Sequence, residues 1–301
     1  MKSTILQILK LKKLKNILVI SLIPEMKKST FKKNQPDWNY KEIVEEIKLF
    51  CDLYEERPIK NNVGGMRFNH AFALYFILKK TNPDLVIESG VFKGQSTWLI
   101  EKTLPQAKLI CLDVDLAKRV YISEKAYYSN LDFRFHDFSK IPENTLVLFD
   151  DHVNHIERIK DANYFKIKNI ILEDNYPSNS GDFQTIKQCY EKHNFKHSLS
   201  ILSILKTFFL FVKILLNKIF INEYNASYNL YLLHNRIRDY HSHNDEFNNL
   251  NKIIETYYEF PPINNQESDS NQSKFIIKDK KLEKYQSELK YYNYLTYINL
   301  K

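Results

Sequence analysis

The chain has 301 residues, of which only five are glycine, 44% are hydrophobic and 14% are aromatic. At the usual ~7% of residues, a chain of this length would carry about 21 glycines. These figures exclude collagen-like, glycine-rich linker and glycine-dense phosphate-loop architectures, and the apolar content excludes a disordered protein. Glycine this scarce should be kept for tight turns and for places where backbones approach closely.

The net charge of +8 comes from one end of the chain. Residues 1–33 hold nine lysines and one acid, Glu25, and so account for all of it. The rest of the chain balances 35 basic against 35 acidic side chains. A neutral body lacks the basic face that polynucleotides require, so we expect no nucleic-acid partner.

The cysteines indicate the compartment, because they are odd in number, far apart and without a CxxC pair: Cys51, Cys111 and Cys189. This usage is typical of a reducing environment, so we expect a cytoplasmic protein without disulfides. Peripheral contact with the inner membrane is an alternative, through the basic arm 1–33 and the apolar stretch 199–221. Lys206 and Lys213 interrupt that stretch, and a lysine at a helix centre costs ~2.5–3.5 kcal/mol on membrane insertion. We therefore expect an amphipathic helix that covers the core, a homo-oligomer interface or a membrane surface.

The composition divides the chain into four segments. We expect a basic amphipathic arm, a core, a helical insertion with a polar linker, and a C-terminal segment that returns to the sheet, at residues 1–35, 36–200, 201–273 and 274–301. Within the core, 36–80 is predicted to be helical, with a turn at Gly64-Gly65.

Beyond residue 84 short apolar runs alternate with segments that suit helices. The runs predict strands at 84–89, 107–113, 131–136, 145–150 and 168–173, and the segments between them predict helices at 94–103, 117–128, 152–164 and 183–193. Buried strands joined by helical crossovers indicate an α/β fold with a doubly wound, mostly parallel sheet.

Each predicted strand ends in carboxylates, at the edge of the sheet where open α/β folds bind their ligands. The acids are Glu88, Asp113 with Asp115, Asp137, Asp150 with Asp151, and Glu173 with Asp174. Five consecutive strands ending in acids predict a binding site at that edge.

The first strand runs into the turn ExGxxxG, formed by Glu88, Gly90 and Gly94 and followed by Ser96. The Glu88 carboxylate would repel the pyrophosphate of a dinucleotide. S-adenosylmethionine (SAM) suits the turn better, because it has no phosphate and carries a sulfonium and an ammonium. Asp113 is then placed to bind ribose hydroxyls, and Asp137 with Phe138 to meet the adenine.

The stretch VIESGVFKGQST…LICLDVD resembles the motif I and II region of class I SAM-dependent methyltransferases. The later stretches LFDDHVNHIER and IILEDNYPSNSGD resemble the macrocin O-methyltransferase and cephalosporin-hydroxylase-like branch. The resemblance covers roughly residues 60–200 and implies a Rossmann-like methyltransferase fold. It also implies a divalent metal, Mg²⁺ or another, held by Asp150, Glu173 and Asp174, with the general base at His152. Glu173 and His152 stand where that branch has aspartates.

The same set is chemically sensible without the resemblance. Carboxylates at neighbouring strand ends can hold a hard cation that binds the substrate oxygens and lowers their pKa. A neutral imidazole can then accept the proton, and Asp151 stands beside His152 as a second catalytic candidate. Helix capping is the structural alternative for these acids, and His155 is a competing base.

Gly64 and Gly65 precede Arg67, which can bind a carboxylate or phosphate of the acceptor. An ordinary helix–helix turn is the alternative there. Gly181 follows the acids of the fifth predicted strand. We predict that all five glycines border one pocket.

The favoured function is SAM-dependent O-methylation of a hydroxyl on a small molecule or sugar, such as a surface-glycan precursor. Two alternatives stay open: a metal-dependent hydroxylase or hydrolase on the same fold, and a non-catalytic binding protein of glycan assembly.

Overall fold

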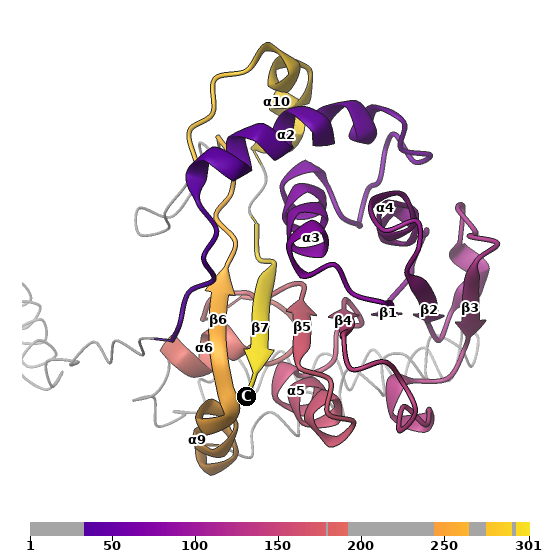
Figure 1. Cartoon of the computed structure of the whole chain (residues 1–301), viewed down its shortest axis with the longest axis vertical. Coiled ribbons are helices and arrows are strands. Elements are labelled where there is room, and N and C mark those ends of the chain that lie inside the picture. Colours follow the sequence, from indigo (N-terminus) through magenta and orange to yellow (C-terminus); the bar gives the residue numbers. More distant parts are fainter. Residues whose placement is uncertain (1–32, 179, 192–243, 265–274, 291–292) are drawn as a thin grey trace, which may run out of the picture.

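The computed structural model describes residues 33–178, 180–191, 244–264, 275–290 and 293–301 (Figure 1). The arm at 1–32 and the predicted helix at 199–221 lie outside the described residues, so both predictions stay open. No helix among the described residues has the length and apolar character needed to cross a membrane.

One seven-stranded sheet organises the fold, in the order β3-β2-β1-β4-β5-β7-β6. All strand pairs are parallel except those of β7, which is antiparallel to both β5 and β6. The strands are β1 (Leu85–Ser89), β2 (Lys108–Leu112), β3 (Ala126–Ser129), β4 (Thr145–Phe149), β5 (Asn169–Leu172), β6 (Ile254–Glu259) and β7 (Thr296–Leu300). The predicted fold class, an α/β fold with a doubly wound and mostly parallel sheet, is confirmed.

Helices cover both faces of this sheet (Figure 1). Alternate residues of β1 point to opposite faces, because side chains alternate along a strand. Val86 packs in one core cluster, while Leu85 and Ile87 pack in the other. On the first face lie α2 (Tyr40–Glu55), α3 (Phe68–Thr81), α4 (Gln95–Thr103) and α10 (Gln286–Leu289); on the second lie α5 (His155–Tyr164), α6 (Ile186–Glu191) and α9 (Asn244–Ile253).

Helix α3 lies at the centre of the first face, and its N-terminus borders the site. Residues 68–78 are all buried, which explains why the segment is apolar on every side. Glu288 of α10 accepts hydrogen bonds from the backbone N–H of Phe68 (3.2 Å) and the Tyr54 hydroxyl (2.6 Å). The C-terminal segment therefore fixes the start of α3, where Gly64, Gly65 and Arg67 lead in.

The third strand differs from its prediction. The run 131–136 is not a strand, and the segment 117–128 holds no α-helix. Asp132 accepts a hydrogen bond from the N–H of Arg134 and starts a 3-10 turn, Phe133–Phe135, whose Phe133 enters the core. The actual strand, β3, lies at the edge of the sheet and leaves Tyr127 exposed, so it lacks the apolar run that marks a central strand.

The C-terminal part of the chain completes the sheet. The final strand predicted within 291–300 is observed as β7, inserted between β5 and β6. The described part of the predicted insertion, 244–264, forms α9 and also β6, a strand that the sequence did not predict. Phe260, just after β6, is buried in the core, so it belongs to the packing and not to an acceptor cleft.

Candidate active site

The turn after β1 requires both of its glycines. Gly90 and Gly94 have left-handed φ angles of 99° and 86°. A Cβ on Gly90 would lie 2.0 Å from the backbone oxygen of Asp150, and one on Gly94 would lie 2.4 Å from that of Tyr121. No other residue fits either position, which confirms that glycine is reserved for special corners here.

Asp113, predicted to bind ribose, holds this turn in shape. One carboxylate oxygen accepts hydrogen bonds from the backbone N–H groups of Val91 and Phe92, both at 2.8 Å. The other accepts from the N–H of Asp115, also at 2.8 Å. Asp113 therefore links the end of β2 to the turn after β1, and its ribose contact stays a prediction.

Glu88 is fully buried at the end of β1. One oxygen, Oε2, accepts hydrogen bonds from the Thr97 hydroxyl (2.5 Å) and the Cys111 thiol (3.3 Å). The other, Oε1, has no hydrogen-bond partner among the described residues. Burial raises the pKa of Glu88 to about 7.

Gln95 lies on the other side of the same turn, as the first residue of α4, and Ser96 is buried beside it. Neither the oxygen nor the nitrogen of the Gln95 side chain has a partner in the described part of the chain, although both atoms are buried. An unpaired buried polar group costs about 1–3 kcal/mol, so such atoms gather where a ligand supplies the missing bonds. The turn thus presents unpaired polar atoms from both of its flanks.

Asp137 and Phe138 do not reach the end of a strand, contrary to the adenine-site prediction. Because β3 ends at Ser129, both follow the 3-10 turn instead. Phe138 is buried against Phe133 and Phe165, with ring centroids 4.8 and 5.3 Å away. Asp137 is exposed and accepts a hydrogen bond from the N–H of Ser139. Phe138 is therefore a core residue.

Three side chains from the loops after β4 and β5 form a donor cluster: Asp150, His152 and Asp174. One potential ligand atom from each lies within 4.8 Å of the other two. They line a narrow pocket together with residues that include Phe149, Val153 and Phe183. His152 and Asp174 both have left-handed φ angles, 56° and 54°, a strain that is common at functional sites.

Glu173 lines the same pocket but is not one of the three residues of the donor cluster, and its role as a metal ligand stays a prediction. Its carboxylate lies in close contact with Nδ1 of His70, from α3. Nε2 of His70 in turn accepts a hydrogen bond from the backbone N–H of Tyr294 (3.2 Å). Burial, followed by the charge of Asp174, raises the pKa of Glu173 well above its usual range. Glu173 therefore ties β5 to α3 and to the C-terminal segment.

His152, and not Glu173, is the third member of the donor cluster. Its Nδ1 lies 3.2 Å from a carboxylate oxygen of Asp182, and its Nε2 lies 3.8 Å from Asp174. The hydrogen bond to Asp182 raises the pKa of His152 to about 10, helped by the charges of Asp150 and Asp174. The ring is then protonated at neutral pH and balances the carboxylates. In this state it cannot accept a proton, in contrast to its predicted role as a neutral base.

Asp150 is the least compensated member of the donor cluster. Burial raises its pKa well above the usual range, and the charges of Glu173 and Asp174 raise it further. A desolvated carboxylate between two others favours either a proton or a cation. The donor cluster therefore has the electrostatic character of a cation site.

Asp151 lines the same pocket, but its carboxylate is held by other side chains. Its Oδ2 accepts hydrogen bonds from the Ser89 hydroxyl at 2.5 Å and from the guanidinium of Arg158 at 2.8 Å. Arg158, 1% exposed, also pairs with Asp132 and Asp161. Asp151, predicted to be catalytic, therefore belongs to a buried ion-pair network. No local pattern indicates this network, because a lone arginine in a helix is usually solvated.

His155, the competing base, is structural. It is buried, its Nε2 donates a hydrogen bond to the backbone oxygen of Glu173 (3.1 Å), and its Nδ1 accepts one from the N–H of Ile186 (3.3 Å). Burial lowers its pKa to about 4, so the ring is neutral and both nitrogens are occupied.

The turn at Gly64 and Gly65 packs beside the turn that follows β1. A Cβ on Gly64 would lie 3.9 Å from the ring of Phe92, and the ammonium of Lys93 donates a hydrogen bond to the backbone oxygen of Val63 (3.1 Å). Arg67 is the N-cap residue of α3 and is partly exposed. Its acceptor contact stays a prediction.

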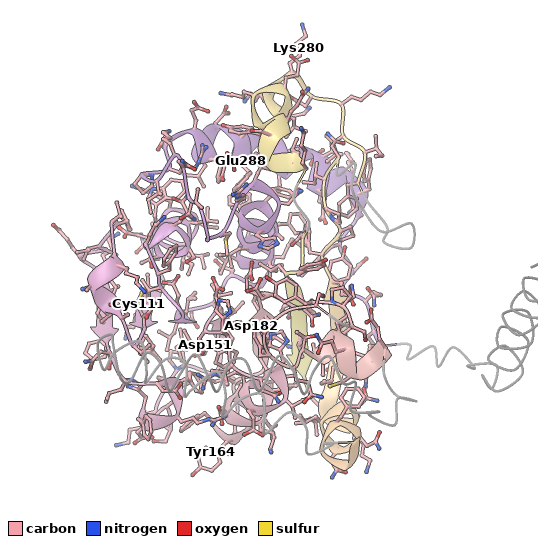
Figure 2. The ribbon with its side chains drawn as sticks, turned by 180° about the vertical axis from the view of Figure 1, so that it is seen from behind. Cys111, Asp151, Tyr164, Asp182, Lys280 and Glu288 are labelled. Atoms are coloured by element: carbon pink, nitrogen blue, oxygen red, sulfur yellow. The ribbon has the colours of Figure 1, made fainter. Side chains whose placement is uncertain are left out.

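Gly181 lies on the other side of the donor cluster, between the ring of Tyr176 and the carboxylate of Asp182. A Cβ there would come within 2.6 Å of that ring. Figure 2 shows Asp182 and Asp151 close together in the view, on the two loops that meet at His152. None of the five glycines is among the residues that line the pocket at the donor cluster, so the prediction that all five border one pocket is not confirmed.

Comparison with known proteins gives structural neighbours only. No family model matches the chain, and no curated protein matches it in sequence. Similar solved structures include an apo structure of CmcI (16% identity, 48% of this chain and 68% of that one, TM-score 0.32). A Podospora anserina methyltransferase with SAH bound has 11% identity over 46% of this chain and 71% of its own, with a TM-score of 0.34. The O-methyltransferase from Bacillus cereus in complex with SAH has 12% identity over 48% and 68%, with a TM-score of 0.33. The function therefore has to be argued from the residues of the site.

Proposed function

We propose that the chain is a SAM-dependent O-methyltransferase acting on a hydroxyl of a small molecule or sugar. One observation carries the proposal: the turn that follows β1 contacts the backbone of Asp150, a residue of the donor cluster. Gly90 approaches the backbone of Asp150 so closely that a Cβ would lie 2.0 Å from its oxygen. A ligand bound at the turn and an acceptor bound at the donor cluster would then be neighbours, as a direct group transfer requires.

The residues around the turn suit a cationic cofactor. Glu88 Oε1 and the Gln95 amide are buried acceptors and donors without partners among the described residues, and Glu88 is negative when ionised. An ammonium would pair with them, whereas a pyrophosphate would be repelled. SAM, when bound, supplies an electrophilic methyl group on its sulfonium.

The donor cluster suits a divalent cation. Asp150 and Asp174 offer carboxylate oxygens and His152 offers an imidazole nitrogen, all within 4.8 Å of one another. A bound cation lowers the pKa of a hydroxyl that coordinates it. The chain's own contribution is to hold these donors beside the turn and to balance the acids with protonated His152 until a cation binds.

Calorimetric titration with SAM and SAH tests the proposal. We expect binding to the wild type and a loss of at least about tenfold in Glu88→Gln, which removes the charge and keeps the shape. Glu143→Gln is the matched control, because Glu143 is exposed and precedes β4, at the edge of the sheet opposite the turn. If the wild type does not bind SAM at millimolar concentration, the methyltransferase proposal fails. A metal-dependent hydroxylase or hydrolase using the donor cluster then becomes the better reading.

The acceptor and the location belong to the same proposal. A sugar of a surface-glycan precursor would fit a cytoplasmic enzyme that contacts the inner membrane through the lysines of residues 1–33. Co-sedimentation with anionic vesicles tests this: binding that is lost when the arm's lysines are replaced by glutamine supports it. Binding that is absent in the wild type at low salt refutes it.

A further inference from the structure

We propose that His152 is a metal ligand positioned by Asp182, so that the donor cluster prefers a first-row transition ion to Mg²⁺. The inference deepens the metal part of the proposed function and rests on it for the purpose of the cation.

The two ring nitrogens of His152 have different surroundings. Nδ1 lies 3.2 and 3.4 Å from the two carboxylate oxygens of Asp182. Nε2 faces Asp174, with 3.8 Å between the nitrogen and Oδ2. A histidine that ligates a metal usually donates its other N–H to a carboxylate, which fixes its tautomer and orientation. Asp182 stands in that place, so Nε2 is the nitrogen that would bind a cation, which displaces its proton to solvent.

The position of Asp182 is itself set by the backbone. It follows Gly181, which has a φ of 80° and lies against the ring of Tyr176. Asp182 is therefore a positioning residue: it acts on the cation only through the His152 ring.

The third carboxylate that would make an all-oxygen site is occupied elsewhere. Glu173 pairs with His70 and is not a member of the cluster. The donor set is thus two carboxylates and one imidazole. Mg²⁺ prefers oxygen donors in octahedral geometry, whereas imidazole favours ions such as Co²⁺, Ni²⁺ and Zn²⁺.

The spacing is compatible with such an ion. Bonds from these ions to nitrogen and oxygen are about 2.0–2.2 Å long, so donors in a loaded site lie about 3–4 Å apart. The donors here lie within 4.8 Å of one another. A modest side-chain rotation brings them to that distance.

The test measures metal binding to the full chain after treatment with a chelator. Co²⁺ and Mg²⁺ affinities are obtained by competition calorimetry, and the visible absorption of bound Co²⁺ reports a nitrogen ligand. Every protein site favours transition ions to some degree, so the deciding quantity is the change in the Co²⁺-to-Mg²⁺ affinity ratio between variants.

We expect His152→Asp to lower that ratio by at least about tenfold and to shift the Co²⁺ spectrum. Asp182→Asn should weaken Co²⁺ binding by about 10- to 100-fold, as loss of an orienting carboxylate does elsewhere. Asp84→Asn is the control of the same residue type, exposed and preceding β1 at the opposite edge of the sheet. Its affinities should equal those of the wild type.

Two results would overturn the inference: an unchanged ratio and spectrum in folded His152→Asp, or unchanged Co²⁺ affinity in Asp182→Asn. If His152→Asp does not fold, Asp182→Asn decides alone. SAM binding is measured separately on the same preparations. Its absence, with the metal preference intact, defeats the methyltransferase proposal and leaves the ligand assignment standing.

Discussion

Arg158 and Asp151 form an ion pair of 2.8 Å, and Asp151 lies in the loop after β4, between Asp150 and His152 of the donor cluster. The arginine is buried and also binds Asp132 and Asp161, so one cation from α5 serves three acids. The shape of the loop after β4 therefore depends on Arg158, which is not a member of the donor cluster.

Replacement of Arg158 by methionine tests this dependence. It removes the buried guanidinium that three partly buried carboxylates share, and removing one partner of a buried pair costs about 3–5 kcal/mol of unfolding free energy. Arg134→Met is the matched control, because Arg134 pairs with Glu157 and Asp161 at the surface and should cost less than about 1 kcal/mol. Urea denaturation measures both, and equal losses would contradict the buried role.

Gly90→Ala should disrupt the turn and the donor cluster together. Alanine would be strained at a φ of 99°, and its Cβ would collide with the Asp150 backbone. We expect a loss of at least about 3 kcal/mol in stability, along with weaker SAM binding. Gly64→Ala provides the comparison: it shares a left-handed φ, but its Cβ would make only ordinary van der Waals contact with the Phe92 ring, so it should cost about 1 kcal/mol. Thermal unfolding and calorimetry would show whether the two variants differ.

The raised pKa of Glu88 predicts that the stability of the protein falls as pH rises. Its pKa is about 7 in the folded chain against 4.5 as the ordinary value, so the folded state binds the extra proton between these pH values. Stability should therefore decrease from about pH 4.5 to 7, by roughly 3 kcal/mol for this group alone. Glu88→Gln should remove that decrease. The slopes of unfolding free energy against pH give the answer, and identical slopes in both proteins would argue against a buried neutral acid.

His155 predicts the opposite slope. Its pKa is about 4 in the folded chain against the ordinary 6.5, so the unfolded chain binds the extra proton between these values. Stability from this group is lost as pH falls from about 6.5 to 4. His155→Gln should lose less stability on acidification than the wild type over that range. A steeper acid loss in the variant would contradict the assignment, and chemical denaturation at pH 4.5 and 6.5 suffices to decide.

The fold was predictable where burial of a strand on both faces requires a continuous run of apolar residues. The central strands β1, β2, β4 and β5 fall within the predicted runs, because strands buried on both faces are continuously apolar. The edge strand β3 was missed for the converse reason, and β6 because its aromatic and polar residues alternate without a clear run.

For the site, the sequence predicted which acids lie at the carboxyl ends of the strands, but not which side chains pair with them. The rule for open α/β sheets located Glu88, Asp150 and Asp174 correctly at one edge. It could not say which acids face a cation and which are paired, because the partners His70 and Arg158 come from helices on opposite faces. Such pairings depend on tertiary contacts that no local pattern encodes.

The strand β7 lies between β5 and β6, although it follows both in the chain. Its Tyr297 donates a hydrogen bond to Asn169, 128 residues earlier. Among the named strands β6 pairs only with β7, so the last part of the sheet cannot form until β7 has been synthesised. Long-range pairing of this kind slows folding. We therefore expect chains shortened by the residues of β7 to expose the edge of β5 and to depend on chaperones or aggregate.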